Sequence, residues 1–161
     1  MSDDEFKKIY PFTAFNFSVE IEVPGFPDKA LCGGAFAECD GLEMTMDVKT
    51  IREGGNNTQQ VRLTGAVNYG TLTLKRGMTG NYDLWKWFGK IYEPGQGGLR
   101  ARTTVVVHSA DHTADRATFV LTGCLPVKLK APPLSGKDGM VAIEELQVAY
   151  ETMRFSPPPS N

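Results

Sequence analysis

The stretch from Phe12 to Val23 constrains the fold most, because apolar and polar residues alternate along it with a period of two. Its apolar positions are Phe15, Phe17, Val19, Ile21 and Val23, and the residues between them are Asn16, Ser18, Glu20 and Glu22. Successive side chains of a β-strand point to opposite faces, so this pattern predicts a strand with one buried face. Half-buried strands of this kind are typical of antiparallel sheets.

Most of the remaining chain is also divided into short strand-like segments by Gly, Pro and Asn. The predicted strands are residues 34–42, 43–52, 60–63, 72–75, 103–108, 118–122 and 127–130. Pro126 separates the last two, which predicts a bulge or a sheet edge there. The segments 43–52 and 60–63 would pair as a long hairpin.

One segment has helical spacing. Its apolar residues are Leu84, Trp85, Phe88, Ile91 and Tyr92. Asn81 suits the N-cap position, and Glu93-Pro94-Gly95 ends the helix. The spacing assigns Trp85 to the core and places Trp87 away from the centre of the apolar stripe, so Trp87 is the better candidate for an interface.

Residues 141–150 fit two interpretations. A helix would align Ala142, Leu146, Ala149 and Met153, whereas a strand would need a β-bulge at Glu144-Glu145. The neighbouring strands favour the second. The fold class is therefore mainly β, an antiparallel β-barrel or sandwich with one flanking α-helix and a projecting hairpin arm. We expect one domain over residues 1–156 and an extended Pro-rich tail over 157–161.

The bulk composition excludes some classes of function. Of the 161 residues 41% are hydrophobic, and the net charge of −2 gives no general attraction to nucleic acid or to anionic membranes. Three cysteines do not make a disulfide framework. The acidic N-terminus does not resemble a secretory signal, and no stretch approaches the ~20 apolar residues of a membrane helix. We expect synthesis in the bacterial cytoplasm and no stable membrane insertion.

The candidates for catalysis or metal binding are weak. His108 and His112 have the spacing of helical metal ligands, but they follow a predicted strand. Gly136-Lys137 is followed by Asp138, where a phosphate-binding loop requires Ser or Thr. Glu144 and Glu145 are adjacent, so on a strand they point to opposite faces. We expect no catalytic residues, no metal and no cofactor.

The polar run from Arg52 to Asn57 lies where the long hairpin must turn. It reads Arg52-Glu53-Gly54-Gly55-Asn56-Asn57, and its Gly and Asn residues tolerate turn conformations. A projecting hairpin is only marginally stable alone in water. We therefore expect this arm to be covered by a partner subunit.

Four stretches in this order carry a family resemblance. They are residues 15–21 with 36–42 (FNFSVEI and FAECDGL), 51–56 (IREGGN), 70–77 (GTLTLKRG) leading into the Trp-containing helix, and 141–146 (VAIEEL). Together they resemble the tail tube proteins of contractile-tailed phages and of phage-tail-like contractile injection systems. The resemblance covers nearly the whole chain, and each motif is short and structural.

The resemblance implies a non-enzymatic subunit that forms stacked hexameric rings, the rigid inner tube inside a contractile sheath. Implied partners are other copies of the chain, the sheath, baseplate and terminator or cap proteins, and DNA or effector cargo in the lumen. The particle would be a phage tail or an injection system. The implied inter-subunit contacts are Arg52, Glu53, Gly54, Gly55, Asn56, Asn57, Lys75, Arg76 and Gly77, with Trp87 added as above. The alternatives are a monomeric β-sandwich that binds a ligand and a small hydrolase.

Overall fold

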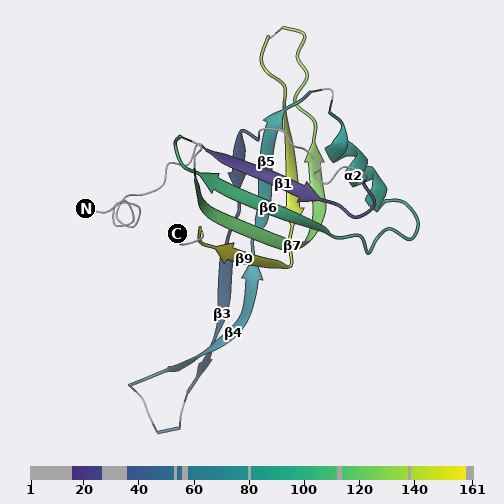
Figure 1. The fold of residues 1–161 in the computed structure, drawn as a ribbon. Coiled ribbons are helices and arrows are strands. Elements are labelled where there is room, and N and C mark those ends of the chain that lie inside the picture. Colours follow the sequence, from purple (N-terminus) through teal and green to yellow (C-terminus); the bar gives the residue numbers. More distant parts are fainter. Residues whose placement is uncertain are drawn as a thin grey trace.

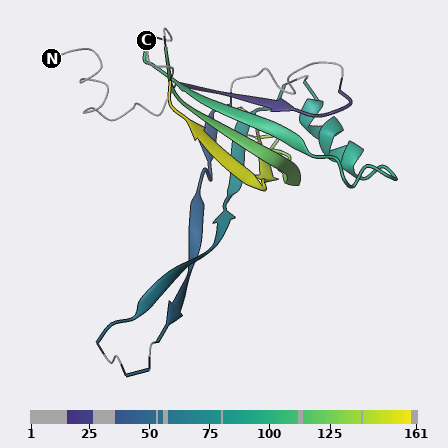
Figure 2. The ribbon, with the colours of Figure 1, turned by 60° about the horizontal axis from the view of Figure 1, so that its bottom comes forward.

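The computed structural model describes residues 16–26, 36–52, 54–55, 58–79, 81–111, 114–137 and 139–158 (Figure 1). Within these ranges the chain is mainly β-strand, with one helix. The elements are β1 (Phe17–Glu22), β2 (Glu38–Asp40), β3 (Met44–Ile51), β4 (Val61–Tyr69), β5 (Thr71–Gly77), α2 (Asp83–Ile91), β6 (Ala101–His108), β7 (Asp115–Lys130), β8 (Ile143–Ala149) and β9 (Thr152–Ser156). The predicted fold class is confirmed: antiparallel sheets, one helix and a projecting hairpin (Figures 1 and 2).

Two groups of strands share the long strand β7. Its first part pairs with β6 and β9, and β1 pairs with β6 on the outside. Its last part, from Leu125 to Lys130, pairs with β8, which leads on to β5 and β2. The register shifts between Pro126 and Lys128, which confirms the predicted irregularity at the proline. The strands of the first group cross those of the second (Figure 1).

The core lies between these strand groups and α2. Its fully buried members include Ile21, Leu72, Leu74, Leu84, Trp87, Leu121, Leu146 and Val148. Each fully buried aliphatic side chain stabilises the fold by about 1.5–3 kcal/mol relative to exposure. Along β1, Val19 and Ile21 are buried while Glu20 and Glu22 are exposed, so the predicted alternation is confirmed there. Residues 12–15 of that predicted strand lie outside the described residues.

The other predicted elements are found with shifted ends. The hairpin is longer than expected, because β4 continues to Tyr69. The predicted strand 34–42 is short: β2 stops at Asp40, before Gly41, whose φ of 97° does not fit a strand. In α2 the N-cap is Tyr82, so the prediction of Asn81 was one residue early. Asn81 still accepts a hydrogen bond at Oδ1 from the Asp83 amide, 3.0 Å away.

The prediction of a β-bulge at Glu144-Glu145 is wrong. The register of β5 against β8 is continuous, with Arg76 opposite Glu144 and Lys75 opposite Glu145. Glu144 therefore shares the buried face with Leu146 and Val148, while Ile143 is 40% exposed. The sequence pattern misled because an acidic residue occupies a core position, where an arginine on the neighbouring strand compensates its charge.

Candidate assembly surface

The β3–β4 hairpin, called the arm below, projects from the body of the subunit (Figures 1 and 2). Its large apolar side chains are exposed in the isolated subunit, with values up to 58% at Met44. They are Met44, Met46, Val48, Ile51, Val61, Leu63 and Val67. Large apolar side chains exposed along a ribbon that has no core of its own mark an interaction site.

The two strands of the arm are held in register with one irregularity. Met44 lies opposite Tyr69 and Met46 opposite Val67, but the register shifts between Met46 and Val48. At this bulge Gly65 faces Asp47 so closely that an added Cβ would lie 2.4 Å from the Asp47 carbonyl oxygen. Only glycine fits there without a shift of the backbone. The bulge thus fixes the pairing of a ribbon that has no core of its own.

The root of the arm is tied to the body by Tyr150. Its hydroxyl donates to the Gly41 carbonyl oxygen at 2.7 Å and accepts from the Glu43 amide at 3.1 Å. The Gly70 amide also donates to the Glu43 carbonyl, 3.1 Å away. At Gly41, an added Cβ would lie 1.9 Å from the Thr71 carbonyl oxygen. These contacts bridge the break between β2 and β3 and fix where the arm leaves the sheet.

The predicted contact residues at the tip are only partly described. Arg52, Gly54 and Gly55 are exposed, and Glu53, Asn56 and Asn57 lie outside the described residues. Lys75 is half-exposed, with its Nζ 3.3 Å from Glu38 Oε2, and Gly77 ends β5 half-buried. Inter-subunit roles for these residues stay predictions.

The assignment of Arg76 to an inter-subunit contact is wrong, because the residue is 4% exposed. Arg76 Nε donates to Glu144 Oε1, 2.5 Å away, and Arg76 Nη2 donates to the Asn81 carbonyl oxygen. Trp85 Nε1 donates to the other carboxylate oxygen of Glu144 at 3.0 Å. A buried charge needs a partner and hydrogen bonds of this kind. The cluster joins α2 to β5 and β8 inside the subunit.

The assignments of the two tryptophans were reversed. Trp87 is fully buried, at 0% exposure, so it cannot contact a neighbouring subunit as the sequence suggested. Trp85 is half-buried at the edge of the core. The buried face of α2 centres on Leu84 and Trp87, three residues apart, and Trp85 lies beside it.

Sequence reasoning missed one arrangement of polar side chains, because its members are far apart in the chain. Ser18 Oγ lies 2.9 Å from His108 Nε2, and His108 Nδ1 lies 2.9 Å from Asp115 Oδ1. A serine hydrolase needs this connectivity, together with a buried acid and donors aimed at an oxyanion. Here the Asp115 side chain is 57% exposed and Ser18 lies within a regular strand. The arrangement therefore meets one of the requirements only.

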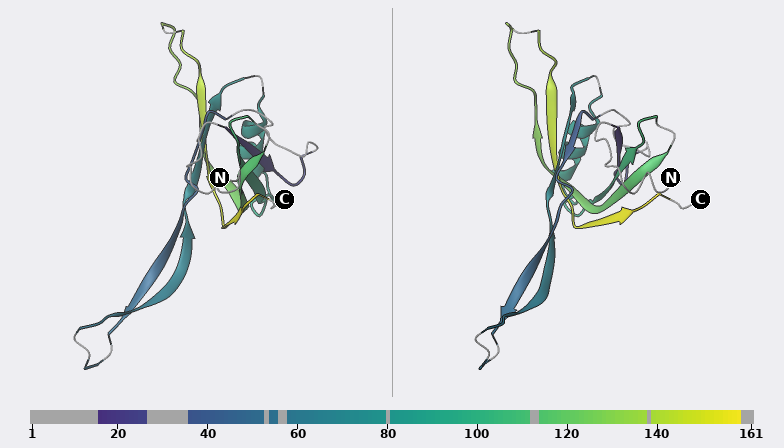
Figure 3. Two further views of the ribbon diagram at one scale, coloured as in Figure 1. Left: turned by 60° about the vertical axis from the view of Figure 1, so that its left-hand side comes forward. Right: turned by 90° about the vertical axis from the view of Figure 1, so that its left-hand side faces the viewer.

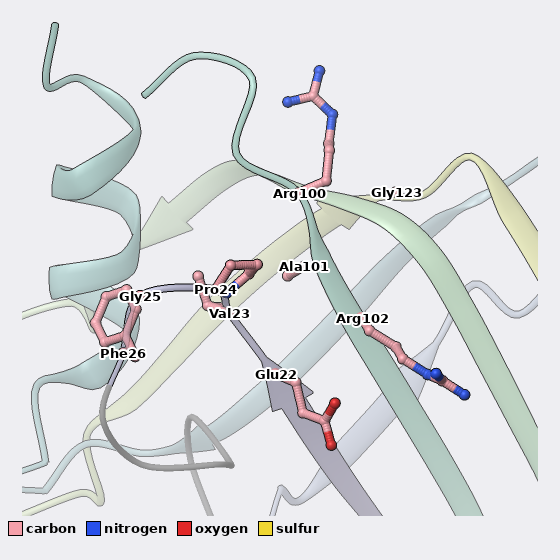
Figure 4. A pocket seen from close by; sticks show the side chains of 9 residues that line it. All are labelled: Glu22, Val23, Pro24, Gly25, Phe26, Arg100, Ala101, Arg102 and Gly123. Carbon is pink, nitrogen blue, oxygen red and sulfur yellow. The ribbon is translucent and has the colours of Figure 1, made fainter. Parts of the chain in front are cut away.

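An open depression of about 510 Å³ lies where β1 ends beside the start of β6 (Figure 4). Its lining includes Glu22, Phe26, Arg100 and Arg102. Arg100 points away from the depression and donates to the carbonyl oxygens of Gly97 and Leu99. Among the described residues, no group of three or more His, Cys, Asp or Glu side chains could hold a metal ion.

Two thiols in the described ranges are free, and both are shielded. Burial, assisted by the neighbouring Asp40 carboxylate, raises the pKa of Cys39 to about 11. Burial likewise raises the pKa of Cys124. Thiols that stay protonated near neutral pH are poor nucleophiles and poor metal ligands. No helix in the described part of the chain has the length and apolar character needed to cross a membrane.

The fold is that of solved proteins from contractile injection systems. The chain has a TM-score of 0.80 and 26% identity to a chain in the six-fold symmetrised baseplate structure of the anti-feeding prophage, covering 92% of this chain and 97% of that one. It has a TM-score of 0.78 and 18% identity to a chain in the extended sheath–tube complex of the extracellular contractile injection system PVC, covering 98% and 99%. It has a TM-score of 0.77 and 17% identity to a chain in the tube-terminating cap structure of the anti-feeding prophage, covering 92% of each chain.

The sequence itself identifies the family. The family model described as T4-like virus tail tube protein gp19 matches residues 13–154. This chain belongs to that tail tube family. A comparison with curated proteins gives no match.

Proposed function

We propose that this protein is the inner-tube subunit of a contractile tail or injection system, and that it assembles into stacked hexameric rings. The observation that carries the proposal is the arm, whose apolar side chains are 39% to 58% exposed in the isolated subunit. Because the chain belongs to the tail tube family, we infer that other copies of the same chain cover this surface.

In this role the protein is a structural conduit. The proposal assigns it no catalytic residue and no cofactor. The near-neutral net charge of −2 suits a conduit, since a strongly basic bore would retain DNA. The proposed partners beyond the tube are a sheath, a baseplate and a terminator or cap, with DNA or effector proteins as cargo. Synthesis would take place in the bacterial cytoplasm, followed by assembly into a phage tail or an extracellular particle.

Electron microscopy of the purified protein tests the proposal. Tubes or six-fold rings are expected at high protein concentration. The double variant Met44→Ser/Met46→Ser should remain folded and fail to form tubes, because it removes apolar contact area and changes no buried residue. A matched control is Tyr92→Ser, which changes a side chain that is 75% exposed on α2's C-cap rather than on the arm.

A monomeric ligand-binding module would give the opposite result. The wild-type protein would then stay monomeric at every concentration, also when baseplate proteins are added to nucleate growth. The arm variant would behave as wild type.

A further inference from the structure

A second projection carries exposed apolar side chains that the proposed function does not yet use. The β7–β8 loop, residues 131–142, exposes Leu134 by 92%, Met140 by 82% and Val141 by 77%. Position 138 of this loop lies outside the described residues. Side chains this apolar and this exposed, gathered in one loop, mark a contact surface.

The loop and the arm lie at opposite ends of the same strands. Gly77 pairs with Ile143 at the end of β5 and β8 that adjoins the loop. Thr71 pairs with Ala149 at the other end, next to the arm root. Figure 3 shows the two projections pointing away from the body in opposite directions. A subunit with unlike apolar surfaces at its two ends is built for head-to-tail contact.

The charges at these two ends are complementary. Exposed lysines towards the loop end are Lys130, which lies opposite Glu145 in the strand register, and Lys137 in the loop itself. The arm root carries the exposed acids Asp40 and Glu43. Within the described ranges, neither those lysines nor these acids form an ion pair inside the subunit. Complementary charges of this kind select partners and fix their register.

We propose that the β7–β8 loop of one subunit docks on the arm root of the next copy in the stack. Leu134, Met140 and Val141 would cover the apolar base of the arm around Met44 and Met46, with the lysines beside Asp40 and Glu43. The contact is heterologous, so it repeats without closing and extends the tube along its axis. This inference rests on the proposed function and adds the identity of the axial contact.

Cross-linking tests the contact directly. Leu134→Cys/Met44→Cys, in a Cys32→Ser background, is assembled into tubes and treated with a short bismaleimide. A ladder of covalent multimers is expected on a denaturing gel, because each subunit would link to the next. The control Tyr92→Cys/Met44→Cys, with its first thiol on the end of α2, should give no ladder. Normal tubes without a ladder from the first variant would overturn the inference and leave the proposed function intact.

Charge exchange gives a second readout. Lys137→Glu or Glu43→Lys alone should raise the protein concentration needed for tube growth about tenfold, since each places like charges together. The double variant should restore most of the tube growth that the single variants lose. Lys86→Glu, the same change on the exposed face of α2, should leave growth unchanged. If the double variant is as impaired as the two single variants combined, the loop does not meet the arm root. If wild-type protein forms no tubes at all, the proposed function fails first.

Discussion

The strands β4 and β5 follow one another almost directly in the chain, yet they lie in different surroundings. In β5, which pairs with β8, Leu72 and Leu74 are fully buried in the core of the subunit. In β4, Leu63 and Val67 are 44% and 43% exposed, and in the described part of the chain the arm is a separate sheet of β3 and β4 alone. The difference shows that alternating apolar residues in a strand predict a covered surface. They do not tell whether the same subunit or another molecule covers it.

Polar groups differ between the two regions in the same way. In the body, Arg76 and Glu144 are paired and almost completely removed from water. On the arm, Asn68 Nδ2 donates to Asp47 Oδ2 at 3.1 Å in an exposed pair. Exposed pairs contribute little to stability, whereas breaking a buried pair is costly. Substitutions in the body should therefore unfold the subunit, and substitutions on the arm should spare folding and affect assembly.

The largest effect is expected for Arg76→Met. It leaves the Glu144 carboxylate buried without its cation, so the free energy of unfolding should fall by about 3–5 kcal/mol. Chemical denaturation of dissociated subunits at a fixed protein concentration measures this loss. The double variant Arg76→Met/Glu144→Leu should return much of it, because no charge then remains in the core. A double variant that is less stable than Arg76→Met would contradict this account of the pair.

Gly41→Ala should rank next, with a loss of about 3 kcal/mol. The new Cβ would lie 1.9 Å from the Thr71 carbonyl oxygen, at a residue with φ of 97°. Gly55→Ala is the matched control at the arm tip, where φ is 93° and no described atom beyond its chain neighbours lies within 4 Å of the new Cβ. The difference in unfolding free energy between the variants isolates the crowding at the arm root. Equal losses would mean that backbone strain alone sets the cost.

The sequence predicts local features of this structure well and contacts between distant residues poorly. Alternation located β1 and the long hairpin, because period-2 patterning is a local property of the chain. It failed at Glu144, whose place in the core depends on Arg76 across the sheet. It also failed at Trp87, because a short helix with aromatic residues at neighbouring positions allows two choices of buried face. Partners brought together by tertiary structure leave no mark on local periodicity.

The projecting hairpin was predicted, but the apolar character of its exposed side chains was not. The polar tip from Arg52 drew attention to the arm, while the apolar side chains of β3, such as Met44 and Met46, were assigned to an ordinary strand. The alternation in β3 has the same form as that in β1. Only the three-dimensional arrangement shows that β1 buries its apolar face within the subunit and β3 does not.

Tyr150→Phe should have a smaller effect, a loss of about 1–2 kcal/mol, since the Gly41 carbonyl and the Glu43 amide lose their hydrogen-bond partner. The ring contact with Tyr69, at 5.6 Å between centroids, would remain. Hydrogen exchange at the Glu43 amide should quicken more than exchange along β5. Tyr69→Phe is the control, because its hydroxyl has no hydrogen bond to a described residue; it should change stability by less than about 0.5 kcal/mol. If both variants show the same stability and the same hydrogen exchange, the Tyr150 hydroxyl does not anchor the arm.

The smallest effect on stability, below about 0.5 kcal/mol, is expected for Val48→Cys, which places a thiol at a position 56% exposed on the arm. In dissociated subunits at pH 8, this thiol should react rapidly with iodoacetamide, because its pKa stays near the ordinary value of about 8.5. Cys39 should react slowly, since a pKa of about 11 leaves only about one molecule in a thousand as thiolate at that pH.

Reactivity of the two thiols then separates the regions by what covers them. Raising the pH towards 11 should speed modification of Cys39 in dissociated subunits, because the pKa of about 11 is what holds it back. Assembly into tubes should slow the thiol at position 48 and leave Cys39 nearly unchanged, because a neighbouring subunit would cover the arm while the Cys39 side chain is already packed against the core of its own subunit. If position 48 stays fully reactive in assembled tubes, that part of the arm is not an interface, and its apolar side chains need another explanation.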